Sequence, residues 1–330
     1  MATKWTESFD VSGASAYYTR KYATALTTSA TSPGRLQGSY GQGTFTTPSL
    51  GLQNTWTFGA AFYVPSAPTA TNNYVTFFRS GVEQLRVRIN SSRQVEVVRG
   101  STVLATGATT LPASTWFYLE VQATLHTSTG AYEVRINEVT EVSGTGANTA
   151  GSGSNGADAV KFVAVTDACI DDVYVNDDQG GVNDDFLGDQ VVEGILPASD
   201  GASSQWTPST GTDHYAVVDD PANSLNTSDY LSSSTVGQKE YFSMASLAYI
   251  QGGVNAVTAL VMAANDSVGS RTVKTKFRSS GGSEADGDTL TVSGTNNFEQ
   301  LAVWDENPVT AGAWASTEVD GGQFGFELVS

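Results

Sequence analysis

The run CIDDVYVNDDQGGVNDDFLGDQ, residues 169–190, decides the predicted architecture. It opens with an apolar, strand-like segment at residues 170–175 and passes directly into an acidic stretch with two adjacent glycines. A second patterned segment starts near Phe186. A strand followed by such a polar, glycine-containing linker is typical of a domain boundary. We place this boundary near residue 184, so the predicted domains are residues 1–184 and 185–330.

Alternation of apolar and polar residues dominates the chain on both sides of the boundary. LRVRI (85–89), FYLEVQA (117–123) and YEVRI (132–136) show it in the first half, and VKTKF (273–277) and FGFEL (324–328) in the second. This period is typical of strands with one buried and one wet face, as in antiparallel sheets. Helical periodicity is weak, with SMASLAYI (243–250) as the best candidate. The predicted fold class is all-β, with two antiparallel, jelly-roll-like β-sandwiches in tandem.

Some of these segments also resemble a known family. NTWTFGAAFYVP (54–65) and residues 74–100 are similar to strands of concanavalin-A-like (laminin-G-like) sandwiches. In the second half, FLGDQVVEGILP (186–197), QWTPSTGTDHY (205–215) and SSSTVGQKEYF (232–242) resemble a β module of tailed-phage virion proteins. The resemblance implies a concanavalin-A-like domain followed by a second β-sandwich of the virion type.

The same resemblance implies a function, a location and partners. It implies a non-enzymatic structural component of a tailed-phage virion, foremost a capsid decoration or accessory surface protein. Alternatives are a tail-associated or fibre protein that binds host glycans and, second, a glycan-cleaving enzyme. By analogy we expect a homo-oligomer, taken as a trimer, that contacts other virion proteins. We expect assembly in the host cytoplasm and a place on the virion surface.

Composition and charge limit the partners further. The chain has 330 residues and a formal net charge of −18. Nucleic acids and anionic membranes are polyanions, so we expect neither as a partner. The single cysteine, Cys169, excludes an intramolecular disulfide and is expected to be a small buried hydrophobe. We predict neither a leader nor a membrane-spanning segment, since no apolar run is long enough.

Catalytic patterns are sparse, and the sequence predicts neither enzymatic activity nor a bound cofactor. No G-x-S-x-G occurs, and the two histidines, His126 and His214, lie in different predicted domains. Some concanavalin-like sandwiches are glucanases, which align several carboxylates along one strand. The nearest match is Glu284, Asp286 and Asp288, but it lies in the glycine- and serine-rich stretch SSGGSEADGD. We therefore interpret these residues as a solvated hairpin loop.

Two binding hypotheses remain. Carboxylates crowd residues 171–189, and calcium prefers oxygen ligands from such loops, although the EF-hand spacing fails. The candidate metal ligands are Asp171, Asp172, Asp177 and Asp178, although a turn cap bonded to backbone N–H groups is the favoured role of Asp171. Carbohydrate could instead stack on exposed aromatic rings, unless these fill the core. The candidates are Trp206, Tyr215, Tyr230 and Trp304 in the second domain, and Tyr17, Tyr18, Tyr22 and Tyr40 in the first.

Overall fold

The computed structural model describes residues 2–9, 27–29, 35, 40–64, 71–164, 168–220, 226, 228–249, 253–294 and 297–330. Its contacts divide the chain into two compact units. The N-terminal unit ends at Val192, and the C-terminal unit comprises Glu193–Ser330. Strands dominate both units, and the only regular helices in the described residues are η1 (Tyr215–Val217) and α2 (Ser316–Asp320). The all-β, tandem-sandwich prediction is confirmed.

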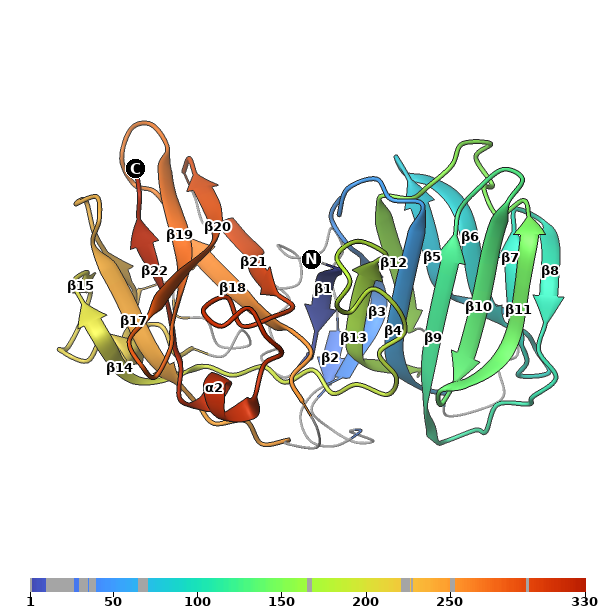
Figure 1. Cartoon of the computed structure of the whole chain (residues 1–330), viewed down its shortest axis with the longest axis horizontal. Coiled ribbons are helices and arrows are strands. Elements are labelled where there is room, and N and C mark those ends of the chain that lie inside the picture. The colour runs from blue at the N-terminus through green and yellow to red at the C-terminus, as the bar shows by residue number, and fades with distance from the viewer. Residues whose placement is uncertain are drawn as a thin grey trace. The chain divides into compact units, whose positions relative to one another are not determined.

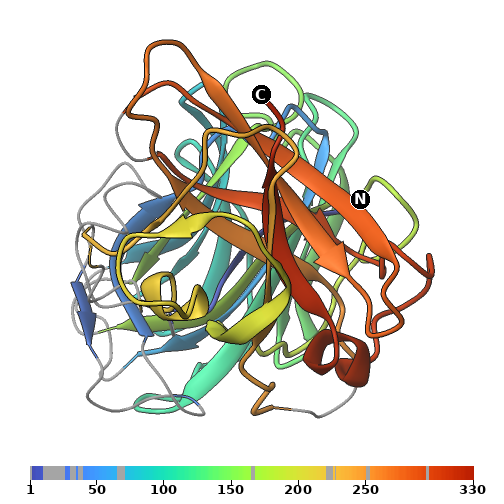
Figure 2. The same ribbon diagram turned by 90° about the vertical axis from the view of Figure 1, so that its left-hand side faces the viewer.

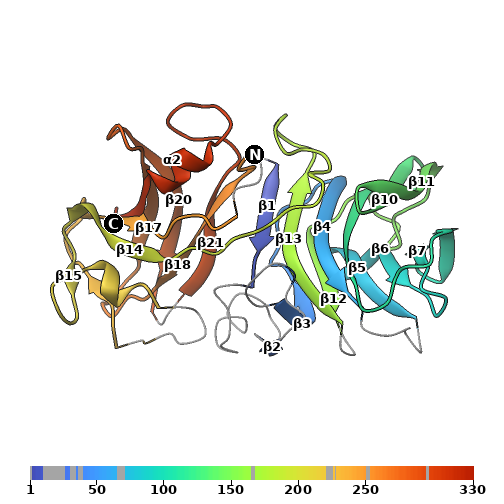
Figure 3. The ribbon, with the colours of Figure 1, turned by 90° about the horizontal axis from the view of Figure 1, so that it is seen from below.

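The N-terminal unit is a sandwich of two antiparallel layers that share strand β3 (Tyr40–Thr46). Figure 3 shows β10 and β11 at one side of this unit, apart from β6 and β7 of the other layer. The first layer contains β1 (Thr3–Glu7), β4 (Thr55–Tyr63), β9 (Trp116–Thr124), β10 (Gly130–Ile136), β11 (Val139–Ala147) and β13 (Cys169–Asp177). The second contains β5 (Asn72–Arg79), β6 (Val82–Ile89), β7 (Val95–Arg99), β8 (Thr102–Thr106) and β12 (Ala159–Ala164), while β2 (Thr27–Ser29) pairs with β3 (Figure 1).

Alternating side chains of these strands fill the space between the layers. On β9, Phe117, Leu119 and Val121 are almost fully buried. Phe162 of β12 stacks on Phe45 of β3, with ring centroids 5.1 Å apart. Burial of each such side chain contributes about 1.5–3 kcal/mol to the stability of the fold, so these side chains hold the two layers together. Cys169 is a buried free thiol, as expected.

The C-terminal unit is a smaller sandwich. Its five-stranded sheet follows the order β14 (Pro197–Ser204), β17 (Lys239–Met244), β22 (Gln323–Leu328), β19 (Arg271–Arg278) and β20 (Glu284–Val292). A second ladder pairs β18 (Val257–Ala263) with β21 (Asn297–Trp304), and a short ribbon pairs β15 (Thr207–Pro208) with β16 (Leu231–Ser232). Phe277, Trp304, Trp314 and Val319 form its core. Helix α2 leads almost directly into β22 (Figure 2).

Two local predictions in this unit are wrong. Residues 243–250 form no helix in their described part, because Ser243 and Met244 complete strand β17 and pair with β14. Residues 284–288 are not a solvated loop but the start of strand β20, which pairs with β19. Cross-strand partners outweigh the glycine- and serine-rich composition here, because strand formation depends strongly on neighbours.

Residues 185–192, which the predicted boundary assigns to the second domain, pack with the N-terminal unit. They fold back over the outer face of its first layer, and we call them the strap. Gly188 donates a backbone hydrogen bond to Glu120, and Val192 donates one to Asp172. The boundary found in the structure therefore follows Val192 rather than residue 184, because these contacts bind the strap to the preceding sandwich.

Candidate functional site

A bulge in β13 shapes the face beneath the strap. Asp171 pairs with Ala61 of β4, whereas Tyr174 pairs with Gly59, so β13 holds one extra residue between the two pairs. Asp172 lies in this bulge with a φ of 53°, a conformation that non-glycine residues adopt uncommonly. Bulges redirect side chains out of the regular alternation. Asp172 is accordingly available to the strap and to Arg35.

Two tyrosines form the centre of this face. Tyr118 of β9 and Tyr174 of β13 stack with ring centroids 6.5 Å apart and pack with Ala61. The Tyr174 ring covers Gly59, where a Cβ atom would overlap the ring. Burial, reinforced by the nearby carboxylate charge of Glu120, raises the pKa of both phenols well above its usual value. Both phenols are therefore protonated hydrogen-bond donors at neutral pH.

Each phenol donates to the acidic part of the face. The Tyr118 hydroxyl donates to the backbone carbonyl of Asp172 at 3.0 Å, and the Tyr174 hydroxyl donates to Oε1 of Glu120 at 2.5 Å. Glu120 is fully buried. Its second oxygen, Oε2, has no hydrogen-bond partner among the described residues. A buried carboxylate oxygen without a donor is costly, so this atom marks a position for an additional polar group.

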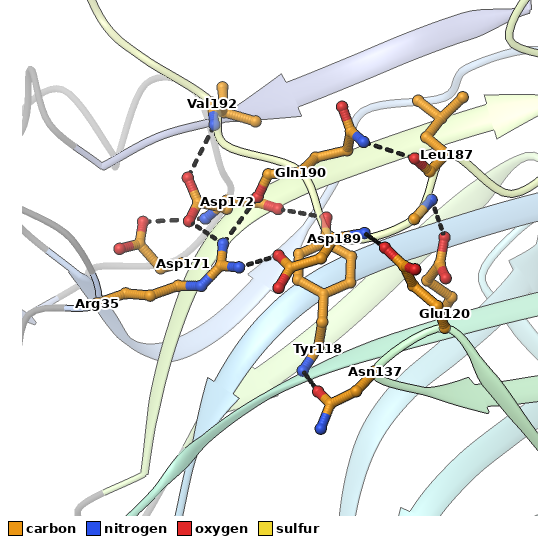
Figure 4. Close-up of polar contacts among 12 residues, drawn as sticks. Arg35, Tyr118, Glu120, Asn137, Asp171, Asp172, Leu187, Asp189, Gln190 and Val192 are labelled. Atoms are coloured by element: carbon orange, nitrogen blue, oxygen red, sulfur yellow. Dashed lines mark hydrogen bonds and ion pairs between the residues drawn. The ribbon is translucent and has the colours of Figure 1, made fainter. Parts of the chain in front are cut away.

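The strap binds this face through its backbone (Figure 4). The N–H of Leu187 donates to the Tyr174 hydroxyl at 3.1 Å, and the N–H of Gly188 donates to Glu120 Oε1 at 2.8 Å. The N–H of Asp189 donates to Glu138 at 3.1 Å. The Leu187 side chain packs on the two tyrosines. A row of oxygen acceptors on the sandwich thus binds successive N–H groups of the strap.

Arg35 joins the strap to the bulge. Its guanidinium donates to Asp172 Oδ2 at 2.5 Å, to the carbonyl of Gln190 at 2.7 Å and to the Asp189 carboxylate. Asp172 also accepts the N–H of Val192 at 2.8 Å. Burial raises the pKa of Asp172, while the Val192 N–H and Arg35 lower it. Burial disfavours the ionised form of Asp172, and Arg35 stabilises that form.

Beyond the strap the same face carries a half-buried aromatic pair. Tyr63 ends β4 and Trp116 begins β9, and the two residues are cross-strand partners. Their ring centroids are 5.8 Å apart at an interplanar angle of 51°, and both side chains are half-buried. Trp116 also packs against the cluster of Ala61, Tyr118 and Tyr174. An aromatic row therefore continues from under the strap to a partly exposed surface.

A second candidate site lies on the five-stranded sheet of the C-terminal unit. Glu284 and Asp286 alternate along β20, so both project from one face of the sheet. Lys239 Nζ lies 2.7 Å from Glu284, and Lys274 Nζ lies 2.7 Å from Asp286. These hydrogen bonds lower the pKa of each carboxyl group. Lys276, almost fully buried, contacts Asp286 and lies 3.4 Å from Glu327 of β22.

The predicted sugar-binding aromatics do not form one site. Trp304 is 6% exposed and belongs to the core, so it offers no ring face to a ligand. Trp206 is half-buried, packs edge-on against Phe326 and donates to the carbonyl of Gln238. Tyr215 lies half-buried in η1, whereas Tyr230 is 52% exposed. In the first domain Tyr40 is buried, and Tyr17, Tyr18 and Tyr22 lie outside the described residues.

The four candidate metal ligands each have a protein partner. Asp171 accepts the N–H of Asp172 at 2.9 Å, which confirms its expected bond to a backbone donor. Asp172 pairs with Arg35, and Asp177 lies 3.0 Å from Lys4. The exposed Asp178 accepts a hydrogen bond from the side chain of Gln179. In the described part of the chain, no group of three or more His, Cys, Asp or Glu side chains is arranged to hold a metal ion.

The residues that build the face beneath the strap were not predicted from the sequence. The prediction of a strand from FYLEVQA depends only on its apolar positions, which point inward. The other positions of the same strand are Trp116, Tyr118, Glu120 and Gln122. Large aromatic rings on the face expected to be wet were an available signal that this face is covered or binds a ligand.

No family model and no curated protein matches the chain. Solved structures show similarity at the level of fold. The chain is 16% identical to domain 4 of the Geobacillus stearothermophilus extracellular arabinanase AbnA in complex with arabinotriose, covering 53% of this chain and 92% of that one, with a TM-score of 0.37. An endo-β-1,4-glucuronan lyase from Trichoderma reesei is 12% identical over 45% of this chain and 79% of its own, with a TM-score of 0.33. A Trypanosoma rangeli sialidase is 8% identical over 46% of this chain and 27% of its own, with a TM-score of 0.34.

These comparisons correct the function expected from the sequence. The similar structures named above are carbohydrate-active enzymes, which contradicts the expected non-enzymatic tailed-phage virion component. At 8–16% identity and TM-scores of 0.33–0.37 they show likeness of fold alone and assign no activity to this chain. The predicted trimer, the virion partners and the virion-surface location stay untested predictions. The β-sandwich architecture is supported. Among the described residues, no helix has the length and apolar character needed to cross a membrane.

Proposed function

We propose that this protein binds a glycan on the outer face of the first layer of its N-terminal unit. The observation that carries the proposal is the half-buried Tyr63–Trp116 pair, with ring centroids 5.8 Å apart. Sugars place their apolar C–H faces on such rings, and neighbouring polar groups orient them. Here the pair continues into the stacked Tyr118 and Tyr174, beside the carboxylates of Glu120 and Asp172.

The test replaces the half-buried ring of Trp116 and leaves the fully buried rings in place. In Trp116→Ala, affinity for a glycan that the wild type binds should fall by about tenfold or more, because a central aromatic contact is lost. Tyr230→Ala is the matched control, since Tyr230 is an exposed ring of the other unit. Binding would be measured on a glycan array and then by calorimetry on the best ligand. A wild type that binds no glycan, or equal losses in both variants, would refute the proposal.

We propose glycan cleavage as a second candidate function, favoured by strand β20. Glycoside hydrolysis commonly uses two carboxyl groups that face one cleft. Glu284 and Asp286 project from one face of the sheet, and their lowered pKa values keep both ionised, so each can act as the nucleophile or base and neither as the acid. Tyr241 lies beside Glu284, and burial followed by the charge of Glu284 raises its pKa, so it stays protonated and is the group that would donate the proton to the leaving oxygen.

Cleavage would be detected as release of reducing ends from a panel of polysaccharides. Glu284→Gln and Asp286→Asn should each lower the rate by about a hundredfold or more, as expected for a group that acts in proton transfer or displacement. Asp178→Asn is the control, because Asp178 is an exposed carboxylate of the other unit. Turnover that survives both substitutions would exclude this site, and absence of turnover in the wild type would exclude the function.

A further inference from the structure

We propose that the strap occupies a second section of the glycan-binding face, and that the ligand which replaces it there is a neutral, hydroxyl-rich glycan. This inference rests on the proposed glycan function and deepens it by naming the ligand class. The strap and the Tyr63–Trp116 pair lie on the same outer face, since Leu187 and Trp116 both pack against Ala61, Tyr118 and Tyr174. A glycan chain bound at the Tyr63–Trp116 pair would meet the strap where the chain extends along this face.

The acceptor row beneath the strap defines the chemistry of its occupant. The oxygens that receive the strap N–H groups belong to Tyr174, Glu120, Glu138 and Asp172. Three of these four are carboxylates, which accept hydrogen bonds and donate none when ionised. Hydroxyl groups of a neutral sugar can supply the donors that the strap supplies now. Arg35, which now binds Asp189 of the strap, offsets only part of the negative charge here, because all three carboxylates remain. A uronate would add to this excess negative charge, so acidic glycans are disfavoured.

The buried oxygen of Glu120 is an independent sign that the strap satisfies this face incompletely. Glu120 is fully buried, yet Oε2 has no hydrogen-bond donor among the described residues. The strap reaches only the neighbouring Oε1, through the N–H of Gly188. A sugar presents several hydroxyl donors within a few ångströms and can reach both oxygens. The strap is thus a partial substitute for a ligand that carries more donors.

Gly188 allows the strap to be loosened without changing any acceptor. Its φ is +78°, and a Cβ atom there would lie 2.8 Å from Oε1 of Glu138. Alanine at this position is therefore strained by its φ, and the exposed carboxylate of Glu138, which binds the next N–H, must also shift to admit it. Gly181 is the matched control. It also has a positive φ, +90°, but a Cβ there meets nothing within 4 Å, and it lies outside the strap.

The experiment measures binding of neutral oligosaccharides (cello-, xylo-, arabino- and galacto-series) and of uronate oligosaccharides to the full chain. Release of the strap removes a competitor, so apparent affinity rises as the open state becomes more populated. In Gly188→Ala the affinity for a neutral series should rise by about fivefold to thirtyfold, and in Gly181→Ala it should not change. Replacement of residues 186–190 by glycine and serine, which also removes the Leu187 anchor, should raise it at least as much. Hydrogen exchange of residues 187–189 reports the loosening.

The possible outcomes distinguish failure of this inference from failure of the proposed function. A loosened strap without a gain in neutral-glycan affinity overturns this inference, and so does an equal gain for uronates. Binding of an extended peptide with the strap sequence in place of oligosaccharides would overturn it in favour of a peptide groove. If wild type binds glycan through Trp116 and only the strap variants fail to gain, the proposed function stands and this inference fails. If no protein binds glycan, the proposed function itself fails.

Discussion

At the scale of single residues, Arg35 offers the most direct test of the contacts beneath the strap. Its guanidinium is the cation that neutralises the buried Asp172, and both side chains are largely inaccessible to water. Arg35→Ala leaves an unpaired buried carboxylate and should destabilise the N-terminal unit by about 3–5 kcal/mol. Denaturant unfolding followed by tryptophan fluorescence measures this loss. A double variant with Asp172→Asn removes the stranded charge and should recover part of it.

The pH dependence of that loss has a definite sign. Burial raises the pKa of Asp172, and removal of Arg35 raises it further. A carboxyl group with a raised pKa in the folded state favours folding at low pH, and this contribution is lost as pH rises through that pKa. The deficit of Arg35→Ala relative to wild type should therefore shrink on acidification. A deficit that grows as pH falls would show that Asp172 is not the group left uncompensated.

At the scale of elements, the β19–β20 ladder carries an ion-pair network that makes its stability depend on pH. The pKa values of Glu284 and Asp286 are lowered, first by hydrogen bonds from Lys239 and Lys274 respectively. Groups with lowered values stabilise the fold above their unfolded pKa, and that contribution is lost as pH falls.

Exchange protection of β20 should therefore decrease in the acid range and depend on salt, because these groups are partly exposed. Hydrogen exchange measured across pH provides the readout. The control is a variant with Glu284→Gln and Asp286→Asn, in which the acid-induced loss should be smaller. A loss of equal size in that variant would assign the pH dependence to other groups.

Elements also show where sequence reasoning succeeded. Alternation in LRVRI, FYLEVQA and VKTKF is a local property, so it correctly predicted the strands β6, β9 and β19. The prediction of a loop at the start of β20 is wrong, because its glycines and serines do not reveal the lysines of β19 and β17 that pair with it. Those partners are distant in sequence and come together only in the sheet.

At the scale of the whole molecule, the same distinction explains the candidate site. Tandem all-β architecture follows from patterns within each strand, so the sequence was sufficient for it. The strap face depends on contacts between remote positions, such as Arg35 with Asp172 and Gly188 with Glu120, which are 137 and 68 residues apart. By composition the acidic run at residues 171–189 indicates a linker or a calcium cluster, because composition places neither the bulge nor Arg35.

The close approach of Gly59 to Tyr174 carries an evolutionary consequence. A Cβ atom at position 59 would overlap the Tyr174 ring, so neither position can change freely while the other is kept. Homologues that acquire any larger residue at 59 must replace the aromatic ring at 174, and with it the phenol that bonds to Glu120. In lineages that have lost the Gly59–Tyr174 pair, position 120 should vary freely. Lineages that keep glycine and tyrosine together should keep Glu120.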